Sequence, residues 1–329
     1  MLDVAELFST IADELEEAAR IFRAELHNGQ PFVHQLCEHV ERFRGKQIRP
    51  ALVLLTGQAC GGVQHEHRVL AAVVEMVHLA TLVHDDVLDE ADIRRRATTV
   101  NRQWGNESAV LLGDFLFSHA FHLCSGLDDQ FAARLIGQTA VSLCTGELMQ
   151  ICNCENYALT EDEYFRIIDC KTASLIGTCC LLGARYAGAD ERTVRRMNEF
   201  GVKLGLAFQI TDDLLDLLGD EAEVGKSLGR DMDKGKLTLP LIHHLRSCDR
   251  RQREELLALH REVVALHGEA TGRRQRITEL LAASDSVEYA RQIAQEHVRG
   301  ALDILGELPP GDARSSLTAM AEFIVARRQ

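Results

Sequence analysis

The sequence is poor in the residues that interrupt helices. Only 5 of its 329 residues are proline, at positions 31, 50, 240, 309 and 310, so residues 51–239 contain none. Because proline removes a backbone donor and clashes with the preceding turn, its absence permits very long helices. Strand-like alternation and low-complexity linkers are also missing. These absences predict an all-α fold, with residues 1–329 forming a single domain of about ten to thirteen helices.

The chain also lacks a surplus of positive charge and a long apolar run. It has 36 Lys and Arg against 50 Asp and Glu, a net charge of −14. Such a chain is a poor general nucleic-acid binder, because neutralising phosphates requires clustered basic residues. No apolar run approaches the roughly 20 residues that cross a bilayer, and the acidic N-terminus is unlike a targeting peptide. We expect a soluble, cytoplasmic protein with no transmembrane segment.

The cysteines do not have the spacing of a zinc site. There are 10 of them, but no Cys-x-x-Cys pair occurs. Structural zinc sites use such pairs, usually with histidine partners. Scattered thiols in a chain of this size indicate free cysteines in a reducing compartment.

Apolar spacing predicts long helices along most of the chain. Residues 3–27 form an amphipathic pattern, a second helix runs to residue 43, and residues 64–90 are almost continuously apolar. A helix that is apolar all round is buried, so the third should be central. Further helices are predicted at 106–124, 128–155, 160–187, 191–218, 237–247, 250–267, 272–283, 286–306 and 312–328.

The strongest chemical pattern is an Asp-Asp-x-x-Asp motif that occurs twice. Residues 85–89 close one apolar helix and residues 212–216 lie near the end of another. Positions i and i+4 share a helix face, so Asp85 pairs with Asp89 and Asp212 with Asp216. Burying several carboxylates requires compensating cations. Hard oxygen ligands favour Mg²⁺, which commonly completes its coordination with water and substrate phosphates.

A single motif of this kind would more often be an exposed acidic helix end. Two of them, each on an apolar helix, make that interpretation much weaker. Asp128 and Asp129 serve as the contrast, since they follow Gly126 without a third acid or an apolar helix. We interpret that pair as a loop or a helix cap.

Cations lie where diphosphates would need them. A basic loop at 45–50 runs into a helix start, where free N–H groups also favour anions. Single basic residues are usually solvated, but together with the acidic motifs they suggest that polyanions are held beside Mg²⁺. His78 lies about two turns before Asp85, and its position is explained equally well by a role in ligand binding and by a place in the core. His84 is interpreted as structural. The basic residues are Lys46, Arg49, Arg94, Arg95, Arg96, Lys171, Lys226 and Lys236.

These residues resemble the trans-isoprenyl diphosphate synthases, the polyprenyl synthetase family, of the medium- or long-chain kind. The resemblance covers about 200 residues in the family's order, and several ordered motifs are highly specific. The matching blocks are GKQIRP at 45–50, EMVHLATLVHDDVLDEADIRR at 75–95, GDFLFS at 113–118, KTASLIG at 171–177, FQITDDLLD at 208–216 and GKSLGRDMDKGKLTLP at 225–240.

The resemblance implies a helical bundle around a deep central cavity, usually a homodimer. It also implies a transferase reaction that joins isopentenyl diphosphate to an allylic diphosphate, with release of diphosphate. Isopentenyl diphosphate would be held by Lys46, Arg49, His78 and Arg95. A trinuclear Mg²⁺ site would use Asp85, Asp89 and Asp212 as main ligands, with Asp216, Asp86 and Asp213 in support. The allylic diphosphate would be gripped by Arg94, Lys171, Lys226 and Lys236, with Thr172 and Gln209 near the allylic carbon.

Two positions depart from the family pattern. Arg96 stands where a glycine typically follows the arginine pair, and Arg44 stands where a second glycine is common before Gly45. Arg96 adds charge and removes a flexible backbone position, which puts in doubt how Arg94 and Arg95 hold the diphosphates.

The residues one helical turn before Asp85 bear on product length. In the family this site acts as a floor, and bulky aromatic residues there stop chain growth early. Ala80 and Thr81 are small, so we expect a product longer than farnesyl diphosphate. Met76, Val77 and Val73 lie deeper on the same stripe and would set the next limit, although they are equally explained as core residues.

Other functions remain as alternatives. The chain would instead be a geranylgeranyl or farnesyl diphosphate synthase if its cavity were short. A terpene cyclase would lack the isopentenyl site, and its second metal motif is typically Asn/Ser/Glu. A non-catalytic subunit of a heteromeric prenyltransferase would tend to lose acidic positions, but both motifs here are complete.

Overall fold

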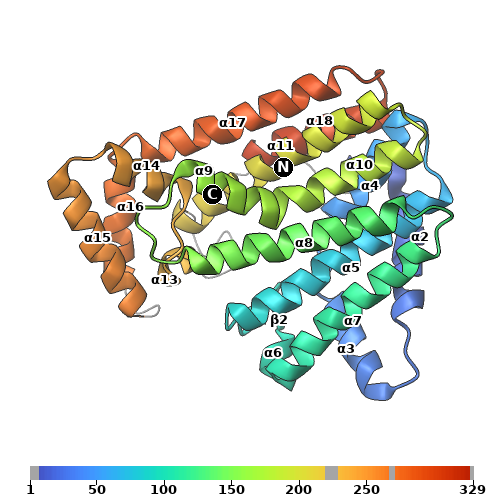
Figure 1. Cartoon of the computed structure of the whole chain (residues 1–329), viewed down its shortest axis with the longest axis horizontal. Coiled ribbons are helices and arrows are strands. Elements are labelled where there is room, and N and C mark those ends of the chain that lie inside the picture. The colour runs from blue at the N-terminus through green and yellow to red at the C-terminus, as the bar shows by residue number, and fades with distance from the viewer. Residues whose placement is uncertain (1–6, 219–228, 267–270, 327–329) are drawn as a thin grey trace. The chain divides into compact units, whose positions relative to one another are not determined.

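The computed structural model describes residues 7–218, 229–266 and 271–326, and these are mainly helical (Figure 1). The expected long helices are confirmed within a few residues at each end, except that the helix ending at Leu26 begins at Ala12, after a 3-10 turn, and not at residue 3. In chain order the first elements are η1 (Ser9–Ile11), α2 (Ala12–Leu26), α3 (Pro31–Glu41), α4 (Ile48–Cys60), α5 (His65–Leu88), α7 (Asn106–Ser125) and α8 (Phe131–Cys152). They are followed by α9 (Glu161–Ile168), η2 (Asp169–Ala173), α10 (Ser174–Tyr186), α11 (Glu191–Leu218), α14 (Leu239–Ser247), α15 (Arg250–Ala265), α16 (Thr271–Ala282), α17 (Ser286–Leu305) and α18 (Asp312–Ala326).

Four short elements were not anticipated from the sequence. Helices α6 (Val100–Trp104) and α13 (Arg230–Asp233) are too short for a periodic pattern. Strands β1 (Ile93–Arg94) and β2 (Ala97–Thr98) form an antiparallel hairpin and are the only strands among the described residues. A strand of two residues has no room for alternation, which is why the sequence did not indicate it.

The chain forms two compact units. Unit 1 comprises Met1–Ala140, Thr178–Asn198 and Gly306–Ala319, and unit 2 comprises Val141–Gly177, Glu199–Leu305 and Met320–Gln329. Each unit is assembled from separate stretches of sequence, and several of the boundaries between stretches fall inside α8, α10, α11 and α18.

Helix α5 is the central element of unit 1. As expected from its apolar sequence, most of its residues are buried, and α2, α4 and α7 pack against it. Its start is fixed by a capping box, in which the Gln64 N–H donates to His67 Nδ1 (2.9 Å). His67 Nε2 lies 2.9 Å from the carbonyl oxygen of Gly183, so a buried ring is satisfied by backbone at both nitrogens.

Helix α7 can approach α5 closely because of a glycine. A Cβ atom built on Gly113 would overlap the ring of His84. That ring lies 3.0 Å, through Nε2, from the carbonyl oxygen of Val110 and 3.6 Å from a carboxylate oxygen of Asp114. His84 therefore packs α5 against α7, in agreement with its structural interpretation.

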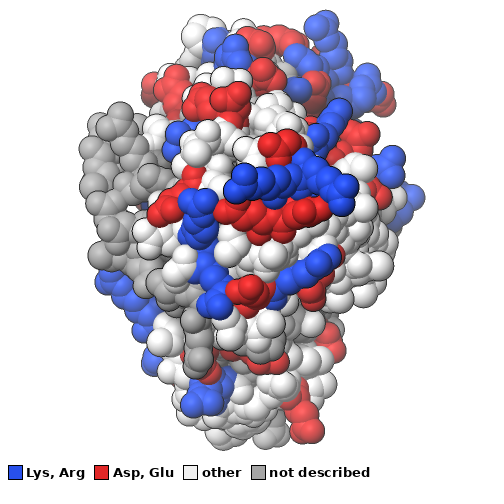
Figure 2. Space-filling view, turned by 90° about the vertical axis from the view of Figure 1, so that its left-hand side faces the viewer, with Lys and Arg blue, Asp and Glu red and all other residues white. Residues whose placement is uncertain are grey.

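In unit 2, residues 161–186 form one continuous helical stretch, α9–η2–α10. By length and composition it is the one described helix that would suffice to cross a membrane, but 72% of its apolar window is buried inside the protein. Ion pairs cover the outer helices α15 and α16, and Figure 2 shows basic and acidic side chains interspersed on the face at that end of Figure 1.

Asp128 and Asp129, the acidic pair outside the two motifs, lie in the loop before α8, in agreement with their interpretation as a loop or a helix cap. The Phe131 N–H at the start of α8 donates to Asp129 Oδ1 (2.9 Å), and the Tyr186 hydroxyl donates to the same oxygen (2.8 Å). Local backbone and hydroxyl donors therefore account for this carboxylate.

Candidate active site

Both aspartate motifs occupy the last turns of long helices. In unit 1, Asp85 lies in the final turn of α5, and Asp89 is its C-cap, whose N–H donates to the Asp85 carbonyl oxygen (2.7 Å). In unit 2, Asp212 and Asp216 lie one turn apart near the end of α11, which closes at Leu218. Each pair therefore has the i, i+4 spacing of a shared helix face, as predicted.

The electrostatics of these helix ends are unfavourable without a cation. The C-terminal end of a helix carries partial negative charge, so basic side chains are preferred there and carboxylates are not. Among the described residues, neither α5 nor α11 has a basic residue in its last turn. The donor set, carboxylate oxygens beside a negative dipole end, fits a hard divalent cation such as Mg²⁺.

The middle aspartate of the first motif is held by an arginine. Asp86 is 1% exposed. Its Oδ1 accepts a hydrogen bond from Arg94 Nε (2.7 Å) and forms an ion pair with the NH2 nitrogen of the same guanidinium (2.7 Å). Arg94 is the last residue of β1, so the unexpected hairpin brings this guanidinium back to the end of α5. In the structure Arg94 thus neutralises a buried carboxylate.

The middle aspartate of the second motif is held by neutral groups. Asp213 is 5% exposed and accepts hydrogen bonds from the Tyr164 hydroxyl (2.7 Å) and from Gln209 Nε2 (2.8 Å). Burial, and then the nearby charge of Asp231, raise the pKa of this carboxyl to about 8. Burial and the same carboxyl also raise the pKa of Tyr164, so Tyr164 acts as a hydrogen-bond donor.

Helix α13 adds a fourth acid to the second motif. The Asp231 N–H donates to Asp216 Oδ2 (3.1 Å), and the Gly229 N–H donates to the Asp216 carbonyl oxygen (3.0 Å). Lys236 Nζ lies 3.6 Å from Asp231 Oδ1, which places this predicted cation beside the acids. Lys226, predicted for the same function, lies outside the described residues.

A π-turn presents Lys171 and Thr172. The five residues of η2 interrupt the α-helical pattern between α9 and α10. A π-turn is wider than an α-turn, and such turns are frequent at functional sites. The necessary room comes from two glycines: a Cβ on Gly146 would lie 2.6 Å from the Lys171 nitrogen, and one on Gly205 would lie 2.5 Å from the Ala173 Cα.

A chain of hydrogen bonds runs from the π-turn to the second motif. The Thr172 hydroxyl donates to Gln209 Oε1 (2.7 Å), and the amide of the same Gln209 donates to Asp213. Lys171 Nζ forms an ion pair with Glu147 Oε2 (2.5 Å), a residue of α8. The predicted Lys171, Thr172, Gln209 and Asp213 are therefore brought together within unit 2.

The predicted basic residues of unit 1 surround a buried glutamate. Glu75, which is 3% exposed, lies near the guanidinium groups of Arg44, Arg49 and Arg95. Burial raises the pKa of Glu75, and these positive charges oppose the shift. Burial and the charges of Arg49 and Arg95 hold the pKa of His78 well below its usual value, so its imidazole is neutral. Lys46 is exposed in the preceding loop.

The hairpin turn explains the usual glycine at position 96. Arg95 and Arg96 form the two-residue connection between β1 and β2, with φ angles of 49° and 65°. Two-residue hairpins favour this left-handed conformation, and glycine adopts it without steric cost. Arg95 is nevertheless anchored, because its NH1 group donates to the carbonyl oxygen of Phe43.

Three of the four candidate floor residues are buried in unit 1, and the fourth, Thr81, is half-buried. Met76, Val77 and Ala80 are each 0% exposed, and the Thr81 hydroxyl donates to the His78 carbonyl oxygen (2.8 Å). Side chains at these positions are thus confined by packing, so a larger one would have to displace its neighbours.

Four residues of these sites were not singled out from the sequence. Glu75, Glu147, Tyr164 and Asp231 each contact or face a predicted residue. Glu75 and Asp231 fall inside the quoted sequence blocks, so they had a local signal. Glu147 and Tyr164 approach their partners only through folding.

Comparisons with known proteins agree with the fold and the motifs. The polyprenyl synthetase family model matches residues 30–271. The chain is 32% identical to heptaprenyl diphosphate synthase component 2 of Bacillus subtilis, covering 98% of this chain and 90% of that protein. It is also 32% identical to a short chain isoprenyl diphosphate synthase of Methanothermobacter thermautotrophicus, with 99% and 98% covered. The crystal structure of a polyprenyl synthase from Caulobacter crescentus, complexed with calcium and isoprenyl diphosphate, matches with a TM-score of 0.91, 29% identity, and 99% and 98% covered.

Proposed function

The chain belongs to the polyprenyl synthetase family, and from that premise we propose that it is a Mg²⁺-dependent trans-prenyltransferase. It joins isopentenyl diphosphate head-to-tail to an allylic diphosphate and releases diphosphate. The single observation that carries the proposal is the position of both aspartate motifs at the negative ends of long helices, without a basic residue in either last described turn. Carboxylate oxygens beside a negative helix end favour a hard divalent cation, and a metal diphosphate supplies one.

The proposed metal is Mg²⁺, and its ligands are Asp85, Asp89, Asp212 and Asp216. When bound, Mg²⁺ supplies charge neutralisation of the departing diphosphate. The relative from Caulobacter crescentus, whose structure contains calcium and isoprenyl diphosphate, supports a divalent cation beside a diphosphate. Asp86 and Asp213 are positioning residues: each is buried and hydrogen-bonded, and so fixes the helix turn that carries the outer aspartates.

Lys46, Arg49, His78 and Arg95 bind isopentenyl diphosphate. Support comes from the positive charge gathered around His78, where burial leaves the ring neutral and able to donate one hydrogen bond. Arg95 is anchored at the Phe43 carbonyl oxygen, which fixes part of its guanidinium before any substrate arrives. A fixed guanidinium loses less conformational entropy on binding.

Lys171, Thr172 and Gln209 act on the allylic diphosphate, with Arg94, Lys226 and Lys236 as further cations. The allylic C–O bond breaks and leaves a carbocation, the alkene of isopentenyl diphosphate donates its π electrons to form the new C–C bond, and a proton is then lost to diphosphate. The fixed hydrogen bonds from Thr172 to Gln209 and on to Asp213 support a role in orienting dipoles toward the developing cation. Holding both substrates in register supplies much of the rate.

The product is longer than farnesyl diphosphate. Relatives of equal identity carry the names heptaprenyl and short chain, so overall identity does not decide the length. The proposal rests on the small side chains of Ala80 and Thr81, with Val77 and Met76 as the next limit. Ala80→Tyr and Thr81→Phe should each shorten the product, and unchanged product length in a folded variant contradicts this assignment.

A second copy of the chain is the proposed partner. Apolar side chains are exposed along α7 at Val110, Leu111 and Phe121. On α8 the exposed apolar residues Val141, Leu148 and Ile151 recur at helical spacing. Such apolar surfaces mark protein interfaces, and most soluble oligomers contain identical copies. Sedimentation should give a dimer for the wild type and a monomer for Leu111→Asp or Leu148→Asp.

The two units together form one catalytic domain in the reducing cytoplasm. In support, several boundaries between units fall inside continuous helices, and all ten cysteines are free thiols.

The reaction is tested by incubating the purified protein with Mg²⁺, labelled isopentenyl diphosphate and each allylic starter in turn. Chromatography should show a ladder that ends beyond farnesyl diphosphate, and no product without Mg²⁺. A matched control is Asp128→Asn, which changes an exposed acid outside both motifs and should leave turnover unchanged. A wild-type protein that binds Mg²⁺ and both diphosphates but forms no C–C bond would point to a non-catalytic subunit.

A further inference from the structure

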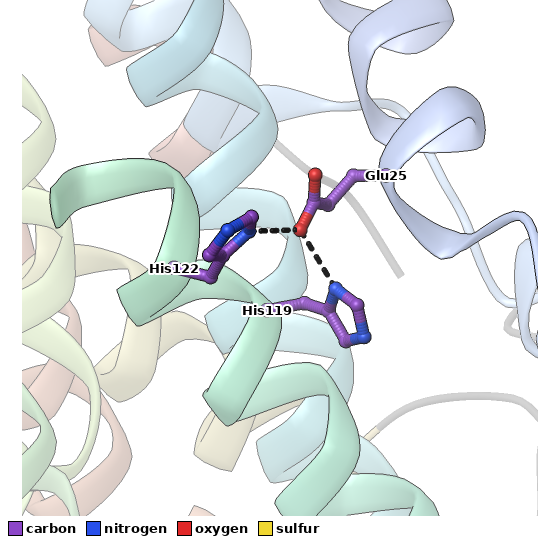
Figure 3. A group of neighbouring side chains, drawn as sticks. All are labelled: Glu25, His119 and His122. Carbon is purple, nitrogen blue, oxygen red and sulfur yellow. Dashed lines mark hydrogen bonds and ion pairs between the residues drawn. The ribbon is translucent and has the colours of Figure 1, made fainter. Parts of the chain in front are cut away.

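A cluster of metal-ligating side chains lies in unit 1 outside the aspartate motifs. Figure 3 shows Glu25, from α2, between His119 and His122, which project from neighbouring turns of α7. The two histidines have i, i+3 spacing, so they share a face of α7. The three ligating atoms all lie within 4.8 Å of one another.

The contacts converge on one carboxylate oxygen. Glu25 Oε1 lies 2.7 Å from His119 Nδ1 and 2.8 Å from His122 Nδ1. An ordinary ion pair needs one such contact, but here two rings from one helix present the same nitrogen to the same point. The ring of Phe115 packs against His119 with 4.2 Å between centroids, which restricts how that imidazole turns.

The burial of the three side chains is graded. Glu25 is 15% exposed, His119 is 26% exposed and His122 is 75% exposed. The carboxylate is therefore fixed from the protein side, while the outer histidine leaves the cluster open to ions in solution. The chain's net charge of −14 further favours cations over anions.

The donor set of two imidazole nitrogens and one carboxylate oxygen suits Zn²⁺ and similar transition metals rather than Mg²⁺. Without metal each ring donates through Nδ1 to Glu25 Oε1. On binding, each neutral ring takes the tautomer with its one proton on Nε2 and coordinates through Nδ1, so no net proton is released from a neutral ring. Ligand bonds of about 2.0–2.2 Å separate tetrahedral ligands by roughly 3.4 Å, so the two close contacts open slightly around the ion.

We propose that Glu25, His119 and His122 form a binding site for a divalent transition-metal ion, with water in the fourth position. The ion links α2 to α7, and both helices pack on α5, the helix that ends in the first aspartate motif. The site is separate from the residues assigned to Mg²⁺ and its existence does not depend on the prenyltransferase reaction. Its effect is to stabilise the fold of unit 1 when the metal is present.

Cobalt provides the probe, because Co²⁺ in a four-coordinate N/O site absorbs visible light far more strongly than Co²⁺ in six-coordinate oxygen sites. The full-length protein is titrated with Co²⁺ in excess Mg²⁺, which occupies the aspartate motifs. We expect one ion per chain, a visible band that Zn²⁺ abolishes, and a melting temperature raised by roughly 5 °C in saturating Zn²⁺.

His122→Gln is the decisive variant, because the His122 side chain is exposed and its replacement leaves the packed core unchanged. It should lose the cobalt band and the zinc-dependent rise in melting temperature while keeping the wild-type circular dichroism spectrum. Glu25→Gln keeps a hydrogen-bond acceptor for both rings and should also lose the band. His34→Gln is the matched control, since His34 Nε2 lies 3.4 Å from a single carboxylate oxygen of Glu38 with no second histidine in that pair. This variant should bind Co²⁺ and Zn²⁺ as the wild type does.

Three results would overturn the assignment. They are a cobalt band of unchanged strength in His122→Gln, a wild-type protein that shows no such band, and a stoichiometry that stays at one ion per chain when Glu25 and both histidines are replaced together.

Discussion

The two aspartate motifs have the same letters at their key positions, yet the two units hold them differently. In unit 1 the buried middle carboxylate of Asp86 is neutralised by Arg94. In unit 2 the similarly buried Asp213 accepts hydrogen bonds from the neutral side chains of Tyr164 and Gln209, and burial raises its pKa to about 8. At this position the first motif carries a charged partner, whereas the second holds a carboxyl whose raised pKa favours the protonated, uncharged form.

This contrast separates two kinds of aspartate within each motif. The outer ones, at i and i+4 near the helix ends, are the proposed metal ligands, while the middle ones are parts of the packed interior. A motif treated as one chemical unit hides this division.

The largest expected effect comes from removing an outer aspartate. Asp85→Asn and Asp212→Asn should each lower turnover about 1000-fold, equal to ~4 kcal/mol of transition-state stabilisation, because each removes a charged metal ligand. Steady-state assays across a Mg²⁺ titration measure the loss, and circular dichroism checks the fold. Turnover within tenfold of wild type for either variant would break the proposed equivalence of the two motifs.

The middle aspartates should differ in stability rather than match. Asp86→Asn leaves the partly buried Arg94 without its carboxylate and should lower the free energy of unfolding by about 2 kcal/mol. Asp213→Asn keeps an acceptor oxygen for the Gln209 amide, and the Tyr164 hydroxyl can turn to accept from the new NH2 group, so that free energy should change by less than about 1 kcal/mol. Urea denaturation in the absence of metal compares them, and equal losses would contradict the contrast.

The fold and the motifs were largely predictable from the sequence. Long amphipathic and apolar patterns gave the helices to within a few residues, and i, i+4 spacing gave the paired carboxylates. The hairpin was missed because two-residue strands have no periodicity. Tyr164, Glu147 and the Glu25 cluster were missed because each partner lies tens of residues away, where only the tertiary fold brings them together.

The π-turn of unit 2 should be sensitive to added volume. Gly205→Ala places a Cβ against the Ala173 backbone and should cost about 1–3 kcal/mol, with reduced turnover because Lys171 and Thr172 shift. Gly272→Ala is the control, since nothing lies within 4 Å of that position, and it should be neutral or slightly stabilising. Thermal unfolding and steady-state kinetics provide both readings. Equal behaviour of the two variants would argue against a tight fit at the π-turn.

The hairpin turn of unit 1 should respond in the opposite direction. Arg96→Gly relieves a left-handed residue and should raise the free energy of unfolding by about 1 kcal/mol, without loss of turnover. Arg96→Ala, which removes the side chain but retains the backbone strain, separates the two effects. A loss of activity in both variants would instead show that the Arg96 side chain binds substrate.

His78 supplies the smallest effect, a pH dependence. Its pKa lies well below the value of 6.5 expected for the unfolded chain, mainly because of burial and then the charge of Arg49. Its contribution to stability is therefore complete above pH 6.5 and is lost as the pH falls below that value, where the unfolded chain binds a proton. His78→Asn should flatten the stability curve on the acid side relative to wild type in denaturant titrations without substrate. A parallel acid slope in the two proteins would contradict a neutral buried ring.

The π-turn also has a consequence for how this part of the chain tolerates change in length. Between Asp169 and Ala173 the helix absorbs one residue more than regular α-helical bonding would. Deleting one residue from this segment would therefore leave an unbroken α-helix in which α10 keeps its buried and exposed faces. It would remove only the wide turn that presents Lys171 and Thr172. At this position a one-residue deletion is expected to preserve the fold and to lower turnover.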